Sequence, residues 1–323
     1  MTATDVMDGT RCLVTGGAGF IGSNIVRALL QRGARVTVLD DLSNGKLEHL
    51  PRSSDLKLVE GDLSTMPDLD TVVRGHDVVF HLAAQVSVVR SYDVTEDDCR
   101  RNILGSVRLY AACRGTKLQR LVYSSSSAIF GEPERLPIDE EHPQRPASYY
   151  GLSKQTAEKY ALLEAQLWGL PAVCLRYFNV YGLPLVKSDY SGVISVFCER
   201  LRTDRPLIVY GDGSQYRDFV HVKDVAAANL LAAERGRAGR TYNVGTGTRT
   251  TILDLAHTLS ALAGVPPNVE HRPLRPGELQ ESVADVSRAR TELGFAPAYD
   301  LAAGLADVWQ GTMRDVPTTG TIG

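Results

Sequence analysis

A tyrosine and a lysine one helical turn apart are the residues of this chain best suited to proton transfer. Tyr150 and Lys154 are separated by Gly-Leu-Ser, and residues four apart share one face of a helix. An ammonium beside a phenol favours the phenolate, so we expect Lys154 to lower the pKa of Tyr150. At ~4 Å and an effective dielectric of ~20 this attraction is about 4 kcal/mol, roughly three pKa units. Because the same spacing is common on ordinary surface helices, the rest of the chain must decide.

A glycine-rich turn near the N-terminus predicts dinucleotide binding. A short apolar run leads into Gly16-Gly-Ala-Gly-Phe-Ile-Gly22, and a helical pattern follows. Glycines let the backbone approach a pyrophosphate, which rests on the helix N-terminus. The next strand pattern ends in Asp40, 24 residues after Gly16. A carboxylate there bonds the ribose hydroxyls and repels a 2′-phosphate, so the sequence predicts NAD rather than NADP.

The composition of the 323 residues is that of a soluble enzyme, with 43% hydrophobic and 23% charged residues. A net charge of −3 without a basic cluster argues against nucleic acid as a partner. No apolar run is long enough to span a membrane, so we expect no membrane association. Five cysteines without metal-ligand spacing predict a reduced, cytoplasmic protein, and no histidine pair supports a metal site.

The first half alternates strand and helix patterns. Several strand patterns are continuous apolar runs, which suit parallel strands that are covered on both faces. Helical patterns lie between them, including 95–114 and 149–168. Repeated βα units predict an α/β fold, a Rossmann-type doubly wound parallel sheet. The predicted strands are 11–15, 35–40, 56–60, 77–83, 120–125 and 172–178.

After Asn179 the elements become shorter, which predicts a smaller α/β substrate-binding lobe over 180–315 beside a dinucleotide-binding domain over 10–179. Because no sharp linker separates the two parts, we expect interleaving, with segments from 217–245 returning to the first domain. The small polar tail 316–323 is predicted to be disordered. Within the lobe we expect helices near 193–203, 224–235, 251–263, 285–293 and 301–314, and strands at 207–210 and 241–244.

Several motifs in a fixed order resemble the extended short-chain dehydrogenase/reductase family, in its nucleotide-sugar epimerase branch. The resemblance covers about residues 10–310. It implies NAD as cofactor, a nucleotide-sugar substrate that is UDP-linked, and a homodimer formed through the helices at 95–114 and 149–168. The motifs are Thr15-Gly-Gly-Ala-Gly-Phe-Ile-Gly22, Gly61-Asp-Leu63, His81-Leu-Ala-Ala84, Ser124-Ser-Ser-Ser-Ala-Ile-Phe-Gly131, Tyr150-x-x-x-Lys154, Arg176-Tyr-Phe-Asn-Val-Tyr-Gly182, the segment from Gly211 to Asp224, and Arg275-Pro-Gly-Glu278.

The resemblance also implies residue roles. Ser126 matches the catalytic serine or threonine, Tyr150 the base and acid, and Lys154 the partner of the nicotinamide ribose. Asp40 would hold the adenosine ribose, and arginines would grip the diphosphate, which suits their planar charged forks. The implied cofactor site comprises Gly16, Gly19, Phe20, Ile21, Gly22, Asp40, Asp62, Leu63, Ala83, Tyr150 and Lys154. The implied substrate site comprises Ser87, Ser126, Asn179, Arg217, Arg275, Glu278 and Ser282.

Two positions after Ser126 bear on the type of reaction. Related dehydratases carry Asp-Glu there, and this chain has Ser127 and Ala128. Eliminating water needs an acid and a base, and related decarboxylases also keep the glutamate. We therefore predict a nucleotide-sugar 4-epimerase that removes and returns a hydride at C4 through a transient 4-keto sugar. A decarboxylase, a dehydratase and a non-catalytic NAD-sensing protein remain alternatives. The small Ser282 would admit N-acetyl sugars or uronic acids as well as plain hexoses.

Overall fold

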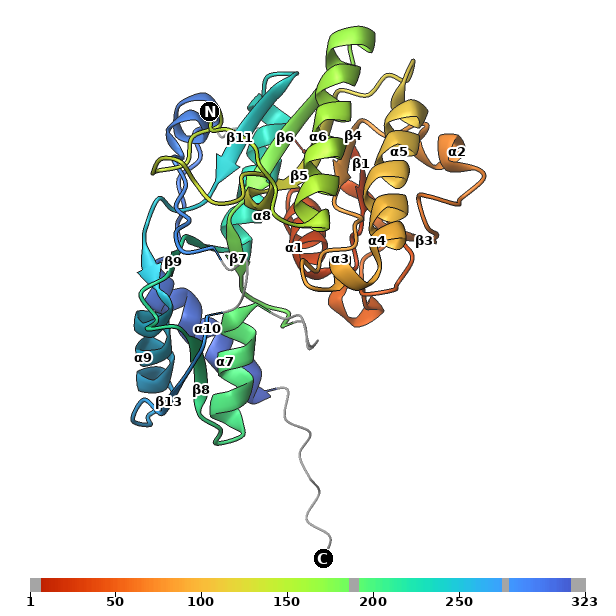
Figure 1. The fold of residues 1–323 in the computed structure, drawn as a ribbon. Helices are drawn as coiled ribbons and strands as arrows, with labels where there is room; N and C mark the ends of the chain where they lie inside the picture. Colours follow the sequence, from red (N-terminus) through yellow and green to blue (C-terminus); the bar gives the residue numbers. More distant parts are fainter. Residues whose placement is uncertain (1–6, 186–191, 275–278, 315–323) are drawn as a thin grey trace, which may run out of the picture.

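The computed structural model describes residues 7–185, 192–274 and 279–314. Its centre is a seven-stranded sheet in the order β11-β6-β5-β4-β1-β2-β3, in which every pair of neighbours is parallel (Figure 1). The predicted doubly wound parallel sheet is thereby confirmed. The strands are β1 (Arg11–Thr15), β2 (Arg35–Asp40), β3 (Leu56–Glu60), β4 (Val78–His81), β5 (Arg120–Ser126), β6 (Ala172–Tyr177) and β11 (Arg240–Val244).

Both faces of the sheet are buried at its central strands, which explains why these strands lack an alternating polar pattern. In β1, Cys12 and Val14 pack on one face with Ile25 and other residues of α1 (Phe20–Gln31). Leu13, between them, packs on the opposite face with residues of α5 (Gly105–Cys113) and α6 (Tyr149–Trp168). Because successive side chains of a strand point to opposite faces, a central strand contributes to two cores and is apolar on both sides, whereas the edge strand β3 is largely exposed.

The two helices predicted beside each other in the first half are present. The helix α6 (Tyr149–Trp168) begins where the Ser148 hydroxyl accepts a hydrogen bond from the Gly151 N–H at 3.0 Å, and it ends at Gly169 with φ +67°. The other forms one helical run with a π-helical segment in its middle. This run consists of α4 (Thr95–Asp98), η2 (Cys99–Leu104) and α5 (Gly105–Cys113).

The second half builds a smaller lobe around its own apolar core, in which α7, α9 and α10 pack against short strands (Figure 1). The structure shortens the helix predicted at 285–293 to η4 (Ala289–Leu293). The other elements are β7 (Asn179–Tyr181), α7 (Val193–Arg202), β8 (Leu207–Tyr210), β9 (Tyr216–Arg217), β10 (Phe219–His221), α8 (Val222–Arg235), β12 (Thr250–Thr251), α9 (Ile252–Leu262), β13 (Val269–Arg272) and α10 (Leu301–Arg314).

The chain crosses between the two parts more than once. The strand β11 comes after the first strands of the small lobe and yet pairs with β6 in the large sheet. The division of the chain at 179/180 remains a proposal, and the tail 316–323 lies outside the described residues. Among the described residues, no helix is long and apolar enough to cross a membrane, and no cluster of metal-ligating side chains forms. All five cysteines are unpaired.

Candidate active site

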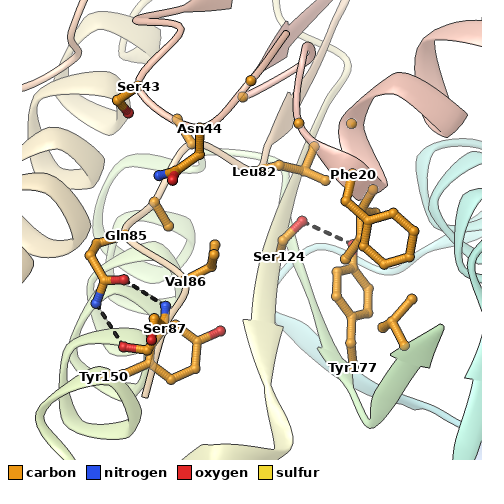
Figure 2. Close-up of a pocket in the computed structure, with 18 of the residues that line it drawn as sticks. Phe20, Ser43, Asn44, Leu82, Gln85, Val86, Ser87, Ser124, Tyr150 and Tyr177 are labelled. Atoms are coloured by element: carbon orange, nitrogen blue, oxygen red, sulfur yellow. Dashed lines mark hydrogen bonds between the residues drawn. The ribbon is translucent and has the colours of Figure 1, made fainter. Parts of the chain in front are cut away.

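A cavity of about 820 Å³ opens at the carboxyl ends of the large sheet's strands (Figure 2). This edge is where open α/β sheets bind ligands, because the chain leaves adjacent strands there in loops. The cavity gathers most of the residues that the sequence predicts for cofactor, chemistry and substrate. These lining residues are Gly16, Gly19, Phe20, Ile21, Gly22, Asp40, Asp62, Leu63, Ala83, Ser87, Tyr150, Lys154 and Asn179.

The glycine turn fits the backbone of a dinucleotide. A Cβ at Gly16, where φ is +69°, would lie 2.7 Å from the Ala83 nitrogen. A Cβ at Gly22 would lie 2.1 Å from the Gly16 carbonyl oxygen. The turn therefore needs glycine at both positions to pass between β4 and α1, and it leaves the N-terminus of α1 open towards the cavity.

Asp40 is fixed at the end of β2 by the backbone on both sides. Its carboxylate accepts hydrogen bonds from the Ala18 and Leu42 N–H groups, each at 2.9 Å. Burial nevertheless raises the pKa of Asp40, and these two bonds oppose the rise. A carboxylate held this rigidly at the cavity wall suits ribose hydroxyls and disfavours a phosphate, in keeping with NAD.

Tyr150 is half-buried at the other end of the cavity and does not have the lowered pKa that its spacing from Lys154 predicts. Desolvation raises its pKa to about 12, the hydrogen bond with Ser126 lowers it, and the charge of Asp98 raises it further. The prediction of a depressed pKa is therefore wrong. Desolvation is the largest influence on this hydroxyl, because removal from water disfavours the charged form of any acid. Ser126 itself is not among the cavity-lining residues, although it bonds Tyr150.

Lys154 is buried, and its pKa moves in the opposite direction. Burial lowers it to about 8, while the charges of Asp98 and Glu158 raise it. The ammonium lies 4.8 Å from the centre of the Tyr123 ring, a cation–π contact that partly replaces water. Desolvation is thus the largest influence on the pKa of both the half-buried Tyr150 and the buried Lys154.

His81, at the end of β4, is buried next to Leu82 and Ala83 of the cavity wall. Its Nδ1 lies 2.8 Å from the Thr15 hydroxyl and its Nε2 lies 2.9 Å from the Ser106 hydroxyl. Burial, and then the charge of Lys154, lower the pKa of His81 to about 3. The imidazole is therefore neutral at physiological pH and serves as a fixed hydrogen-bonding group.

The residues predicted for substrate binding are not all brought together. Ser87 and Asn179 line the cavity, whereas Arg217 and Ser282 are not among its lining residues. The Arg217 guanidinium donates to the Tyr216 and Leu279 carbonyl oxygens at 2.9 and 2.6 Å. Ser282 is buried, and its N–H donates to the Tyr216 carbonyl oxygen at 3.2 Å. Arg275 and Glu278 lie outside the described residues.

Several cavity residues escape the sequence reasoning. The Gln85 side chain closes the loop over Tyr150 by donating to the Ser87 carbonyl oxygen at 2.9 Å (Figure 2). On the facing wall, Ser124 and Tyr177 share a hydrogen bond of 2.9 Å. The loop after Asp40 could have been found, because Ser43-Asn-Gly45 follows the end of the strand after two intervening residues and indicates a turn there. No local signal distinguishes Gln85 or Tyr177 from ordinary buried residues.

Comparison with known proteins shows the family of the chain. A family profile described as NAD dependent epimerase/dehydratase matches residues 12–245. A UDP-glucose 4-epimerase of Mycolicibacterium smegmatis is 38% identical over 302 residues, 92% of this chain and 96% of the relative. A dTDP-glucose 4,6-dehydratase of Streptomyces niveus is 36% identical over 308 residues, 92% of this chain and 91% of the relative. A solved UDP-N-acetylglucosamine 4-epimerase from Methanobrevibacter ruminantium, in complex with UDP-N-acetylmuramic acid, has a TM-score of 0.92 at 34% identity, covering 96% of this chain and 100% of that one.

The chain therefore belongs to the NAD-dependent epimerase/dehydratase family, and NAD is its cofactor, as the sequence predicts. Within this family it is a nucleotide-sugar 4-epimerase, which makes it an isomerase.

Proposed function

We propose that the enzyme inverts C4 of a UDP-linked hexose through a transient 4-keto sugar, with Ser126, Tyr150 and Lys154 as its catalytic residues. The observation that carries the proposal is the arrangement of three side chains at one end of the cavity. There the Tyr150 hydroxyl is bonded to Ser126, with Lys154 one helical turn away. An oxidation that is reversed on the same molecule needs one group to take the hydroxyl proton and return it.

When bound, NAD⁺ supplies a hydride acceptor and a positive charge beside this pair. Tyr150 would act from its phenolate form: the phenolate takes the proton of the sugar O4 and becomes the phenol, and the phenol gives that proton back when the sugar is reduced again. Ser126 holds the Tyr150 hydroxyl in line by its own hydrogen bond. Lys154, together with the positive charge of NAD⁺ when it is bound, would favour the phenolate against the desolvation that raises the pKa of Tyr150. This stabilisation is effective because Lys154 is removed from water.

The side chains of the two residues after Ser126 favour epimerisation over dehydration. Ser127 and Ala128 form the short η3 helix (Ser127–Ile129), and the Ala128 N–H donates to the Ser126 hydroxyl oxygen at 3.1 Å. Neither side chain can protonate a leaving hydroxyl or abstract a proton at the neighbouring carbon. Loss of water therefore lacks the acid and base that it needs.

The nucleotide would be held at the small-lobe side of the cavity. Arg217 is oriented by the carbonyl groups of Tyr216 and of Leu279, the residue that follows Glu278 in the sequence. We assign the diphosphate to Asn179, Arg217 and Arg275 and the nucleoside ribose to Glu278. Because the binding energy comes from the nucleotide, far from C4, the 4-keto sugar can turn while the intermediate stays bound.

Ser282 is assigned to the sugar pocket, where its small side chain leaves room for an N-acetyl group. Replacing Ser282 with Tyr should lower kcat/KM for UDP-N-acetylglucosamine by about tenfold more than for UDP-glucose, because the added ring fills the acyl space. Ser287→Tyr, at an exposed position where a short helical segment begins, is the control. Equal losses on both sugars would reject this pocket assignment.

The test of the whole proposal is a substrate panel without added reductant. UDP-glucose, UDP-N-acetylglucosamine, UDP-glucuronic acid and dTDP- and GDP-hexoses are incubated with the enzyme, and product mass and anomeric proton NMR are followed. A new sugar of unchanged mass supports epimerisation and identifies the substrate. A product lighter by water or CO₂ would replace the proposal with a dehydratase or a decarboxylase.

We also propose that the enzyme is a homodimer. One face of α6 exposes an apolar stripe at helical spacing, and Leu104 of the neighbouring η2 is exposed as well. An unpartnered stripe on two adjacent helices suits a second copy of the same surface, giving a two-fold helix bundle. The stripe comprises Tyr149, Leu152, Tyr160, Leu163 and Leu167. Analytical ultracentrifugation tests this proposal. Wild type should sediment at twice the chain mass, and Leu163→Glu should sediment as a monomer. A monomeric wild type would refute the dimer.

A further inference from the structure

The adenosine end of the cavity is bordered by an ion network that the sequence does not predict. Two consecutive arginines of η2, Arg100 and Arg101, converge on Asp97 of α4. The Arg100 guanidinium lies 2.6 Å from the Asp97 carboxylate, and Arg101 Nε lies 2.9 Å from it. Asp97 thus joins the two arginines side by side, and each arginine has further donors to offer.

Each arginine reaches a different wall of the cavity. Arg101 forms an ion pair with Asp41, in the loop after β2. Arg100 lies 2.8 Å from Asp62, in the loop after β3. Asp41, Asp62 and Arg101 all line the cavity. The network therefore ties the loops that follow two neighbouring strands to one helical segment across the cavity mouth.

The loop after β2 is a segment that needs such a tie. Leu42 has a φ of +56°, a left-handed conformation that a leucine rarely adopts without support from its surroundings. The two carboxylates that precede Leu42 in the chain hold the turn. Asp40 accepts from the Leu42 N–H at 2.9 Å, and Asp41 accepts from the Ser43 N–H at 3.0 Å. Asp41 is thus bonded to the turn through one oxygen and to Arg101 through the other.

We propose that Arg101, through its bridge from Asp41 to Asp97, is a clamp that holds the residue 41–46 loop over the adenosine half of bound NAD and so retains the cofactor. Arg101 does not itself react. It pairs with Asp41 of the loop and with Asp97 of α4, so the loop stays next to η2 and the cavity stays narrow at that end. Without Arg101, Arg100 is the remaining cation of the network, and it pairs with Asp62 and Asp97. Asp41 then has no cation in the network, and its repulsion with the neighbouring carboxylates opens the loop. The inference rests on NAD as the cofactor and not on the identity of the sugar.

The test measures NAD binding rather than turnover. Arg101→Ala and Asp41→Asn are prepared free of cofactor, and the NAD dissociation constant is measured by calorimetric titration. Each variant should bind NAD about tenfold more weakly than wild type, and bound NAD should be lost on gel filtration. The double variant should be no weaker than either single variant, because both remove the same bridge. Arg202→Ala, which breaks an exposed ion pair with Glu199, is the control and should match wild type.

Two readouts separate a clamp from a general loss of structure. The thermal midpoint of the cofactor-free variants should stay close to that of wild type, and Arg101→Lys should recover part of the affinity. Raising the salt concentration should weaken NAD binding more in wild type than in Arg101→Ala, because salt screens the bridge. A dissociation constant within twofold of wild type in both single variants, or fully additive losses in the double variant, would overturn the proposal. If Arg101→Ala fails to fold, Asp41→Asn alone decides.

Discussion

The two ends of the NAD cavity differ in what sets the pKa values of their ionisable groups. At the adenosine end, the charged groups of the ion network have partners of opposite charge. Burial tends to raise the pKa of Asp62, but hydrogen bonds from Arg100 and Ser64 and the charge of Arg100 lower it to about 2. At the reaction end, burial dominates and works against charge. There it raises the pKa of Tyr150 to about 12 and lowers that of Lys154 to about 8.

This difference separates binding from chemistry. Groups that remain ionised before and after the cofactor arrives contribute the same interaction to every state of the reaction, so they give affinity without raising the rate. Groups kept out of water gain most when a charge appears next to them, because the low dielectric magnifies the interaction. We therefore expect substitutions at the adenosine end to change cofactor retention and substitutions at the reaction end to change turnover.

Removing the Tyr150 hydroxyl should produce the largest effect of this kind. Tyr150→Phe keeps the ring and its packing but deletes the group that takes the substrate proton. Turnover should fall by about 10³-fold, within the range that general acid–base groups provide, while the NAD dissociation constant stays within twofold of wild type. Steady-state kinetics and calorimetric titration measure the two quantities on the same preparation.

The matched control is Tyr160→Phe, on an exposed turn of the same helix, and it should leave turnover unchanged. Near-normal turnover of Tyr150→Phe would remove Tyr150 from the mechanism. A parallel loss of NAD binding would show instead that the two ends of the cavity are not separable.

Two glycines at the pyrophosphate turn should sharpen the comparison, with an intermediate effect. In Gly22→Ala the new methyl group would lie 2.1 Å from the Gly16 carbonyl oxygen, so the turn must shift. Such overpacking costs about 1–3 kcal/mol of the free energy of unfolding, measured by urea denaturation without cofactor. In Gly19→Ala the closest contact is 3.2 Å to the same oxygen.

Gly19→Ala should therefore keep most of its stability and still bind NAD more weakly, because its methyl group stands where the pyrophosphate approaches the backbone. Equal stabilities of the two variants would contradict the assignment of Gly22 to packing within the turn. Unchanged NAD affinity in Gly19→Ala would contradict the assignment of Gly19 to the cofactor.

The sequence was sufficient for the large sheet because its signals are local. Continuous apolar strands, the glycine turn and the acid at Asp40 each follow from neighbours in the chain. The ion bridge of Arg101 could not be predicted, because its partner Asp41 is 60 residues away. The π-helical η2 that presents Arg101 also carries no distinct sequence pattern. The short strands β9 and β12, two residues each, fall below the length at which periodicity is informative.

The error in the pKa of Tyr150 has a different cause. Spacing identifies Lys154 as a neighbour, and the structure agrees that both residues face one cavity. Spacing does not show how much water remains. Because desolvation is the largest influence on both groups, a prediction based on pairwise charge alone had the wrong sign. The candidate catalytic residues can be found from sequence, whereas their protonation requires the packed structure.

The smallest expected effect concerns His81 and tests how dry the reaction end is. The pKa of His81 is lowered from 6.5 to about 3 by burial and by Lys154. Below pH 6.5 the unfolded chain takes up a proton that the folded protein refuses. His81 therefore contributes stability that is present above pH 6.5 and is lost progressively as the pH falls towards 3. Between pH 6.5 and 5.5 the loss should be roughly 1 kcal/mol, since one pKa unit corresponds to ~1.4 kcal/mol.

The pKa of His221 is lowered like that of His81, and the pKa values of the buried carboxyls of Asp40 and Asp98 are raised. The measurement must therefore compare wild type with His81→Gln. Between pH 6.5 and 5.5 the free energy of unfolding of wild type should fall by roughly 1 kcal/mol more than that of His81→Gln. In wild type the ring carbon shift of His81 should stay constant in NMR spectra from pH 8 to 5. A ring that titrates near 6.5 would mean that water reaches His81. The contrast between paired charges at the adenosine end and desolvation at the reaction end would then fail at a residue whose pKa Lys154 helps to lower.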